Sequence, residues 1–219
     1  MGPLGRRLKQ LQQYIRFSQA AREWISSQKS DKGIRPDLLS RLCLNWRNSW
    51  SATEEFLLEM AKIAAIHRGP ILECGTGLST LVLGFISEST GNPIYSLEQD
   101  PSWFERVRKD LLHHHLRRNR VILAKLKKFT DYEWYDWTQG PPLPRFAFVV
   151  CDGPPGISWG GRYGLLPQMR DRLMPGCIIL LDDAGREGER EILGRWKREY
   201  GITYELIAGS NPFAKIILP

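Results

Sequence analysis

The sequence predicts an α/β fold with five parallel strands, helices on both faces of the sheet and a closing hairpin. From Pro70 onward, apolar runs alternate with helical patterns, which is typical of a parallel sheet. The last two apolar runs, ITYELIA and KIILP, are separated only by the short GSNPF turn. Because parallel pairing needs a long crossover, these two runs are predicted to pair antiparallel.

The elements follow in order along the chain. The expected parallel strands are residues 70–74, 93–98, 121–126, 146–152 and 177–183. The helical patterns that connect or follow them are residues 79–88, 101–116, 165–174 and 188–201. Ahead of the sheet, Ser51-Ala-Thr-Glu54 is a capping-box pattern that opens a helix ending near Gly69.

Residues 1–50 differ from the rest of the chain in charge. Apolar residues recur at helical spacing from Leu4 to Ile25 with Arg and Lys between them, which predicts an amphipathic helix ending near residues 30–33. This segment holds ten Lys or Arg against three acids, so it carries the whole net charge of +7. We therefore divide the chain into a basic helical extension, residues 1–50, and a sheet domain, residues 51–219. The extension either contacts an anionic partner or is a solvated helix face.

The cysteine pattern and the hydropathy of the chain indicate the cellular compartment in which the protein is expected. The four cysteines form no CxxC pair, and three lie in or beside apolar runs, as expected for core residues under reducing conditions. No apolar stretch approaches the roughly 20 residues that span a bilayer, and the N-terminus has no apolar signal region. We expect a cytoplasmic protein, with residues 1–30 as a possible peripheral contact to an anionic membrane.

Acidic residues end the predicted strands. Ligands of an open parallel sheet bind beyond the carboxyl ends of its strands, and these ends carry Glu73, Glu98, Asp152, Asp182 and Asp183. Such a lining repels phosphates and suits a cationic ligand. Gly75 and Gly77 follow the first strand, but Thr80 replaces the third glycine of a dinucleotide fingerprint and no P-loop lysine is present. A nicotinamide or nucleoside triphosphate ligand is therefore not expected.

The residues E73-C-G75-T-G77-L-S79 resemble the first motif of class I S-adenosylmethionine-dependent methyltransferases. The second strand of that family ends in an acid, as Glu98 does here, and its Rossmann-like sheet has seven strands with the last one antiparallel. VVCDGPPG, RYGLLP and ILLDDAGR are similar to a bacterial branch of the family.

The resemblance implies a cofactor site for S-adenosyl-L-methionine. Glu73 would meet the ammonium end of the cofactor, and the backbone from Gly75 through Gly77 to Ser79 would pack against its methionine and ribose. Glu98 would accept from the ribose hydroxyls, and Asp152 would bind the cofactor facing the reaction centre. The adenine contacts stay open, because AKLKKF after the third strand lacks an acidic signature.

The candidate catalytic residues are Asp152, Asp183, Arg162 and Tyr163. Asp152, Asp182 and Asp183 supply oxygens suited to Mg²⁺, and they partly resemble the acids of catechol-type methyltransferases, in which an amide stands at the place of Asp183. We favour a site without metal, in which these acids cap a turn or bind the acceptor hydroxyl.

The Gly-rich loop 153–164 and the segment TDYEWYDW (130–137) are candidates for the acceptor side. Trp159 could stack on a ring of the acceptor. Arg162 either binds an anionic group of the acceptor or only pairs with Asp152 or Asp183. The segment 130–137 either walls the acceptor pocket or is packed by its own aromatic side chains.

The resemblance implies an enzyme that transfers a methyl group from S-adenosylmethionine to a small-molecule or glycan acceptor, at oxygen. An aminopropyltransferase is one alternative, although CDGPPG replaces the acidic motif of that class. A cofactor-binding module without turnover, recruiting partners through the basic helix, is the other. Nucleic acid is not expected, because D152-G-P-P lacks the aromatic residue that holds a flipped base. The oligomeric state stays open.

Overall fold

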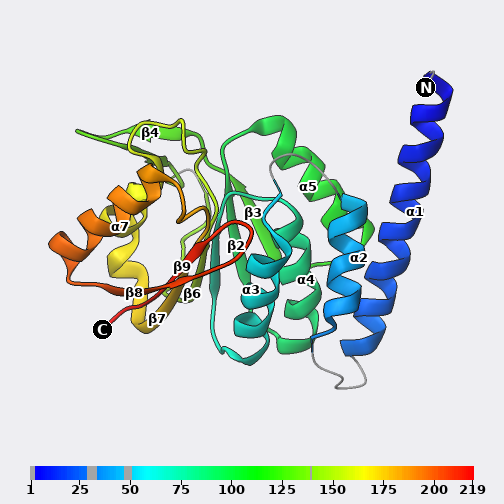
Figure 1. Cartoon of the computed structure of the whole chain (residues 1–219), viewed down its shortest axis with the longest axis horizontal. Coiled ribbons are helices and arrows are strands. Elements are labelled where there is room, and N and C mark those ends of the chain that lie inside the picture. The colour runs from blue at the N-terminus through cyan, green and yellow to red at the C-terminus, as the bar shows by residue number, and fades with distance from the viewer. Residues whose placement is uncertain (1–2, 29–33, 47–50, 139) are drawn as a thin grey trace.

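The computed structural model describes residues 3–28, 34–46, 51–138 and 140–219. Its centre is a seven-stranded sheet in the order β3-β2-β1-β6-β7-β9-β8, with only β9 antiparallel to its neighbours (Figure 1). The strands are β1 (Ile71–Cys74), β2 (Ile94–Glu98), β3 (Asn119–Leu123), β6 (Phe146–Cys151), β7 (Leu173–Leu181), β8 (Thr203–Ile207) and β9 (Phe213–Ile217). The predicted α/β architecture with its closing hairpin is therefore confirmed.

Helices cover both faces of the sheet and bury two apolar cores. One face is covered by α3 (Glu54–Ile66), α4 (Leu78–Thr90) and α5 (Pro101–His113). Outside them, α1 (Pro3–Gln28) and α2 (Pro36–Trp46) pack against α3 and α4 as a further layer. The other face carries α6 (Leu165–Met169), α7 (Glu187–Tyr200) and the 3-10 turns η1 (Gly161–Gly164) and η2 (Arg170–Arg172). No described helix is both long enough and apolar enough to cross a bilayer.

Three local predictions are corrected by the structure. The third strand is residues 119–123 rather than 121–126, because 126–128 form β4 (Leu126–Lys128) and pair with β5 (Glu133–Tyr135) in a separate hairpin. The helix predicted over 165–174 ends early, and β7 begins at Leu173. Thr53, not Ser51, caps α3: its hydroxyl accepts from the amide of Phe56 at 3.3 Å.

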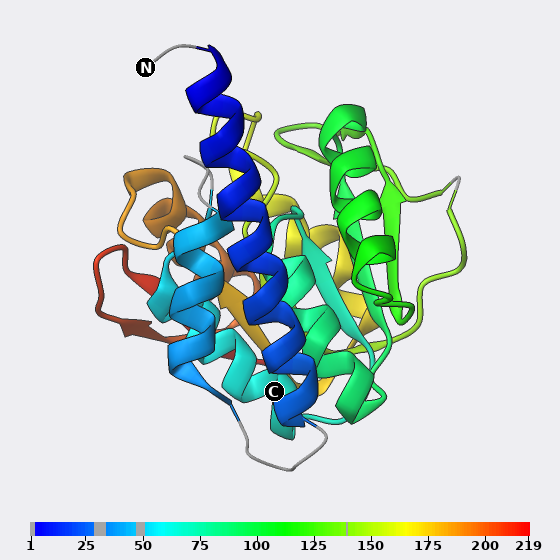
Figure 2. The same cartoon turned by 90° about the vertical axis from the view of Figure 1, so that its right-hand side faces the viewer.

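The N-terminal helix has two halves with different surroundings. Phe17, Ala20, Ala21 and Trp24 are buried in the same core as α2, α3 and α4. The first half projects beyond the body of the molecule (Figure 2). There Leu8 and Leu11 are more than half exposed among exposed Arg and Lys side chains. Part of the extension is therefore structural, and part presents an amphipathic surface.

Candidate active site

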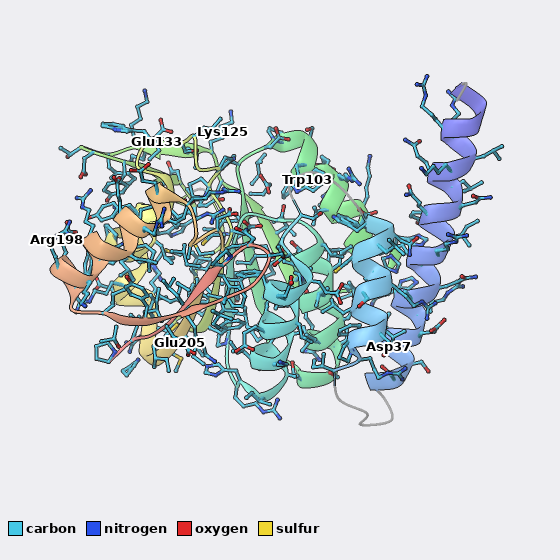
Figure 3. All side chains as sticks on the ribbon, viewed as in Figure 1. Asp37, Trp103, Lys125, Glu133, Arg198 and Glu205 are labelled. Atoms are coloured by element: carbon cyan, nitrogen blue, oxygen red, sulfur yellow. The ribbon has the colours of Figure 1, made fainter. Side chains whose placement is uncertain are left out.

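A cavity of about 590 Å³ opens at the carboxyl ends of β1, β2, β6 and β7. This is the edge of the sheet where Trp103, near the start of α5, lies in Figure 3. The lining residues on which the chemistry depends are Gly75, Thr76, Glu98, Trp103, Tyr135, Asp152, Arg162, Asp182, Asp183 and Asn211. The strand ends predicted from the sequence to hold a ligand thus converge on one cavity.

The turn after β1 is fixed by its contacts to β6 and β2. Gly75 has φ +84°, and a Cβ there would lie 2.9 Å from the amide nitrogen of Gly153. The Glu98 carboxylate accepts from the Thr76 amide at 3.1 Å and the Thr76 hydroxyl at 2.5 Å. Only glycine fits position 75, because the backbone is left-handed there and touches another backbone segment. Glu98 lies on the cavity wall and also holds this turn.

Gly77 and Ser79 line a smaller extension of the cavity. The extension measures about 40 Å³ and shares Thr76, Trp103 and Asp152 with the main cavity. A Cβ on Gly77 would meet no atom within 4 Å, so the backbone of the turn faces open space. The Trp103 indole donates to the Thr76 carbonyl at 2.6 Å and forms one wall of the extension. A ligand can therefore approach the backbone closely at Gly77.

Glu73 lies behind the cavity rather than in it. Its side chain is fully buried and does not line the cavity. Burial raises the pKa of Glu73 from 4.5 to about 7. The hydroxyls of Ser79, Ser96 and Thr80 lie near the carboxylate and offset part of this shift. None of the described residues makes a well-aligned hydrogen bond to either carboxylate oxygen. In this conformation Glu73 does not line the cavity, and its contact with the ammonium end of the cofactor stays a prediction.

Arg162 lies at the centre of the acidic cluster. Its Nη2 donates to Asp152 Oδ1 at 3.0 Å and to Asp183 Oδ2 at 2.7 Å. The guanidinium also donates to two backbone carbonyls, those of Asp152 and Asp182, both at 2.6 Å. Only 2% of the side chain is exposed. Of the two roles predicted for Arg162, the structure shows the pairing with the acids.

Asp183 is held in an unusual conformation by three side chains. It has φ +59°, a left-handed backbone that few non-glycine residues adopt. Its Oδ1 accepts from Asn211 at 2.7 Å, and its Oδ2 accepts from Arg162 and lies 2.7 Å from Arg186. Such strain persists only where the surroundings enforce it, and it concentrates at functional sites. Asn211 comes from the turn before β9, a contact that the sequence did not reveal.

The carboxyl groups of this cluster are hard to ionise together. Burial raises the pKa of Asp152 above its ordinary range; Arg162 opposes this effect, and Asp182 and Asp183 add to it. Burial, followed by the charge of Asp183, raises the pKa of Asp182 to about 6. Asp152 keeps a quarter of its side chain exposed, so it can reach a ligand. A buried acid with a raised pKa can exchange a proton near neutral pH.

Tyr163 is not part of this site. Its hydroxyl donates to Glu199 of α7, and its ring lies under the guanidinium of Arg195 at 3.5 Å. The Tyr163 side chain lines a different groove of about 1090 Å³, between the Gly-rich loop and α7. Although this groove is larger, it has none of the strand-end acids of β1, β2, β6 or β7. Gly156 lines both spaces, so the groove adjoins the cavity.

The aromatic segment 130–137 contributes to the cavity through one residue. Tyr135 lines the cavity and packs so closely that a Cβ on Gly153 would lie 2.3 Å from its hydroxyl. Trp134 is fully buried and packs against Gly164. One residue of the segment therefore lies on the cavity wall and another in the core, and its contact with the acceptor stays a prediction. Trp159, the predicted stacking residue, is half exposed and lines neither space.

Solved structures that superpose on most of this chain show which fold it has. An SAH-bound methyltransferase from Podospora anserina superposes with a TM-score of 0.61 at 15% identity, over 91% of this chain and 88% of that one. An O-methyltransferase from Bacillus cereus, in complex with SAH, gives 0.59 at 16% identity, over 91% and 100%. The fold is that of class I methyltransferases.

A third neighbour of the same fold is named for its acceptor, precorrin-6y. The precorrin-6y C5,15-methyltransferase from Geobacter metallireducens superposes with a TM-score of 0.59 at 16% identity, over 78% of this chain and 90% of that one. A scan against protein families gives no match to the sequence, and a search of curated proteins gives none either. At these identities the likeness establishes the fold, and the chemistry has to be argued from the cavity.

Proposed function

We propose that this protein is an enzyme that transfers a methyl group from S-adenosylmethionine to a hydroxyl oxygen of a small-molecule or glycan acceptor. The observation that carries the proposal is the cavity itself. Glu98, the open backbone at Gly77 and the acidic cluster around Asp152 all line it or its extension. An acid for ribose hydroxyls, room beside a glycine backbone and carboxylates for a cationic sulfur are the groups that such a methyl donor requires.

The residues of the cavity have separate tasks in this reaction. S-adenosylmethionine supplies an electrophilic methyl group on a positively charged sulfur. Glu98 orients the ribose, and the acids around Asp152 offset the positive charge in a partly closed site. Asp152 removes the proton of the acceptor hydroxyl while the acceptor oxygen is held in line with the methyl group. Arg162 fixes the carboxyl group of Asp152 through the 3.0 Å hydrogen bond.

The test of the proposal is calorimetric titration with S-adenosylmethionine and S-adenosylhomocysteine. Binding of both at micromolar concentrations is expected, followed by S-adenosylhomocysteine formation when hydroxyl-bearing acceptors are screened. Binding without product from any acceptor would favour a module without turnover. Transfer of an aminopropyl group from the decarboxylated cofactor would favour the aminopropyltransferase alternative.

Gly77→Ala is expected to weaken cofactor binding by at least tenfold and to leave folding stability unchanged. In the ligand-free protein the added methyl group has open space, and φ at Gly77 is 175°, which any residue adopts. The same methyl group would occupy space that the ligand needs. Calorimetry and thermal unfolding check the two parts separately.

Gly75→Ala is the matched comparison. Its methyl group would clash with Gly153 backbone in the ligand-free protein, so stability and binding should fall together. If Gly77→Ala binds the cofactor as tightly as the unchanged protein, the cofactor does not approach this turn.

The projecting half of α1 supports a second proposal, peripheral contact with an anionic membrane. Leu8, Leu11 and Ile15 are exposed apolar residues, and Arg6, Arg7 and Lys9 are exposed beside them. A helix with this pattern binds at the surface of a bilayer that contains anionic lipids. The basic side chains attract anionic headgroups and the apolar side chains enter the lipid layer, so the expected partner is a lipid surface.

Replacing Arg6, Arg7 and Lys9 by Glu should abolish sedimentation with vesicles that contain phosphatidylglycerol, with the melting temperature unchanged. These side chains are exposed, so the fold does not depend on them. The matched control reverses the same number of charges at Arg190, Lys197 and Arg198, which are exposed on α7. Equal sedimentation of both variants, or none by the unchanged protein, would contradict the proposal.

A further inference from the structure

The acidic cluster of Asp152, Asp182 and Asp183 has the composition of a divalent-cation site. One carboxylate oxygen from each residue lies within 4.8 Å of the other two. Hard oxygen ligands at this spacing suit Mg²⁺ or Mn²⁺, and the cluster partly resembles the metal site of catechol-type methyltransferases. Whether a metal fits here depends on what already contacts these oxygens.

Two of the three carboxylates that a metal would share, those of Asp152 and Asp183, are bonded to a buried guanidinium. Nη2 of Arg162 contacts both Asp152 Oδ1 and Asp183 Oδ2. Asp182 Oδ1 accepts from the amide of Asp183 at 2.8 Å, and Asp183 Oδ2 also pairs with Arg186. A metal ion binds such oxygens at 2.0–2.6 Å. A metal ion shared by these carboxylates would therefore lie close to the guanidinium, and two positive charges repel at close range.

Arg162 is held in place by more than the carboxylates. Two backbone carbonyls accept from its guanidinium, and Glu189 Oε1 lies 3.7 Å from Nη1. These carbonyls would lose buried donors if the side chain moved out, which is costly. The guanidinium is planar and always charged, so it is suited to holding several oxygens at once.

The net charge of the cluster without a metal also suits the positively charged methyl donor. Above neutral pH, where Asp152 and Asp182 also ionise despite their raised pKa, the charges of four carboxylates exceed those of Arg162 and Arg186 by two. The four are Asp152, Asp182, Asp183 and Glu189. A divalent cation would cancel this excess and leave no net attraction for a sulfonium. Without a metal, the remaining negative charge favours a cationic ligand at Asp152.

We propose that Arg162 is the built-in cation of this cluster, a positioning residue that takes the place of a divalent metal, so that the site works without one. The role of Arg162 in methyl transfer rests on the proposed function. The prediction that the cluster binds no divalent cation does not rest on it. Removal of the guanidinium should therefore create a divalent-cation site that the protein otherwise lacks.

The experiment is a Mn²⁺ titration of the ligand-free protein, followed through the spin-resonance signal of free Mn²⁺. The unchanged protein is expected to bind no Mn²⁺ at millimolar concentrations. Arg162→Met, which keeps an unbranched apolar stem and removes the charged guanidinium, is expected to bind one equivalent. Arg162→Lys keeps a charge at the same place and should bind none.

The controls separate a new metal site from general loosening. Adding Asp183→Asn to Arg162→Met should abolish Mn²⁺ binding, and Mn²⁺ should raise the melting temperature of Arg162→Met alone. If Arg162→Met does not fold, the unchanged protein and Arg162→Lys still decide the question. One equivalent of Mn²⁺ bound by either of them and lost with Asp183→Asn would overturn the inference, as would a folded Arg162→Met that binds none.

A parallel measurement keeps the inference distinct from the proposed function. The affinity of the unchanged protein for S-adenosylmethionine should be the same with Mg²⁺ and with a chelator. If no S-adenosylmethionine binds at all, the proposed function fails while the Mn²⁺ titration still stands. If the cofactor binds only with Mg²⁺, the proposed function survives and the role of Arg162 is refuted.

Discussion

Asp152→Asn is expected to lower the turnover of methyl transfer by about 10²–10⁴-fold while changing S-adenosylmethionine affinity little. The carboxyl group lies at the end of β6, a quarter exposed to the cavity and hydrogen-bonded to Arg162. Asparagine keeps the shape and can still contact Arg162 through its carbonyl oxygen, but it cannot remove a proton. Turnover is measured as S-adenosylhomocysteine formation, and affinity by calorimetry.

The pH dependence of the same reaction gives a second readout. Because burial raises the pKa of Asp152, the base form appears only at a pH well above that of an ordinary aspartate. Turnover should therefore rise with pH through the neutral range in the unchanged enzyme, and this rise should be absent in Asp152→Asn. Equal turnover in the two proteins would mean that another group takes the proton.

Glu73→Gln is expected to stabilise the protein at alkaline pH by about 3 kcal/mol and to have little effect near pH 4. The carboxyl group is fully buried, and burial raises its pKa from 4.5 to about 7. Between these two values the folded state binds more protons than the unfolded state. The stability of the unchanged protein therefore falls as pH rises from 4.5 to about 7, and glutamine removes this loss.

Urea unfolding at a series of pH values measures the effect, with Glu205→Gln on the exposed face of β8 as the matched control. The control removes one carboxyl group in solvent and should leave the pH profile unchanged. The same variants decide the role of Glu73 in binding. If Glu73 contacts the cofactor ammonium, Glu73→Gln loses S-adenosylmethionine affinity; if it stays behind the cavity, affinity is retained.

Much of the fold could be predicted because its signals are local. Apolar runs, helix periodicity and the short GSNPF turn lie within a few residues of the elements they specify. The convergence of Glu98, Asp152 and Asp183 also followed from the sequence, since parallel strands bring their carboxyl ends to one edge. The β4–β5 hairpin was missed, because strands of three residues carry almost no periodic signal.

Tertiary structure alone decided what each polar side chain contacts. Glu73 and Glu98 both end strands, yet packing buries one behind the sheet edge and places the other on the cavity wall. Arg162 and Tyr163 are neighbours in the chain, but the 3-10 turn η1 sends one into the acidic cluster and the other toward α7. The spacing of apolar residues predicts which face of a helix or strand is buried. The partner of a buried charge is instead fixed by distant segments that fold against it.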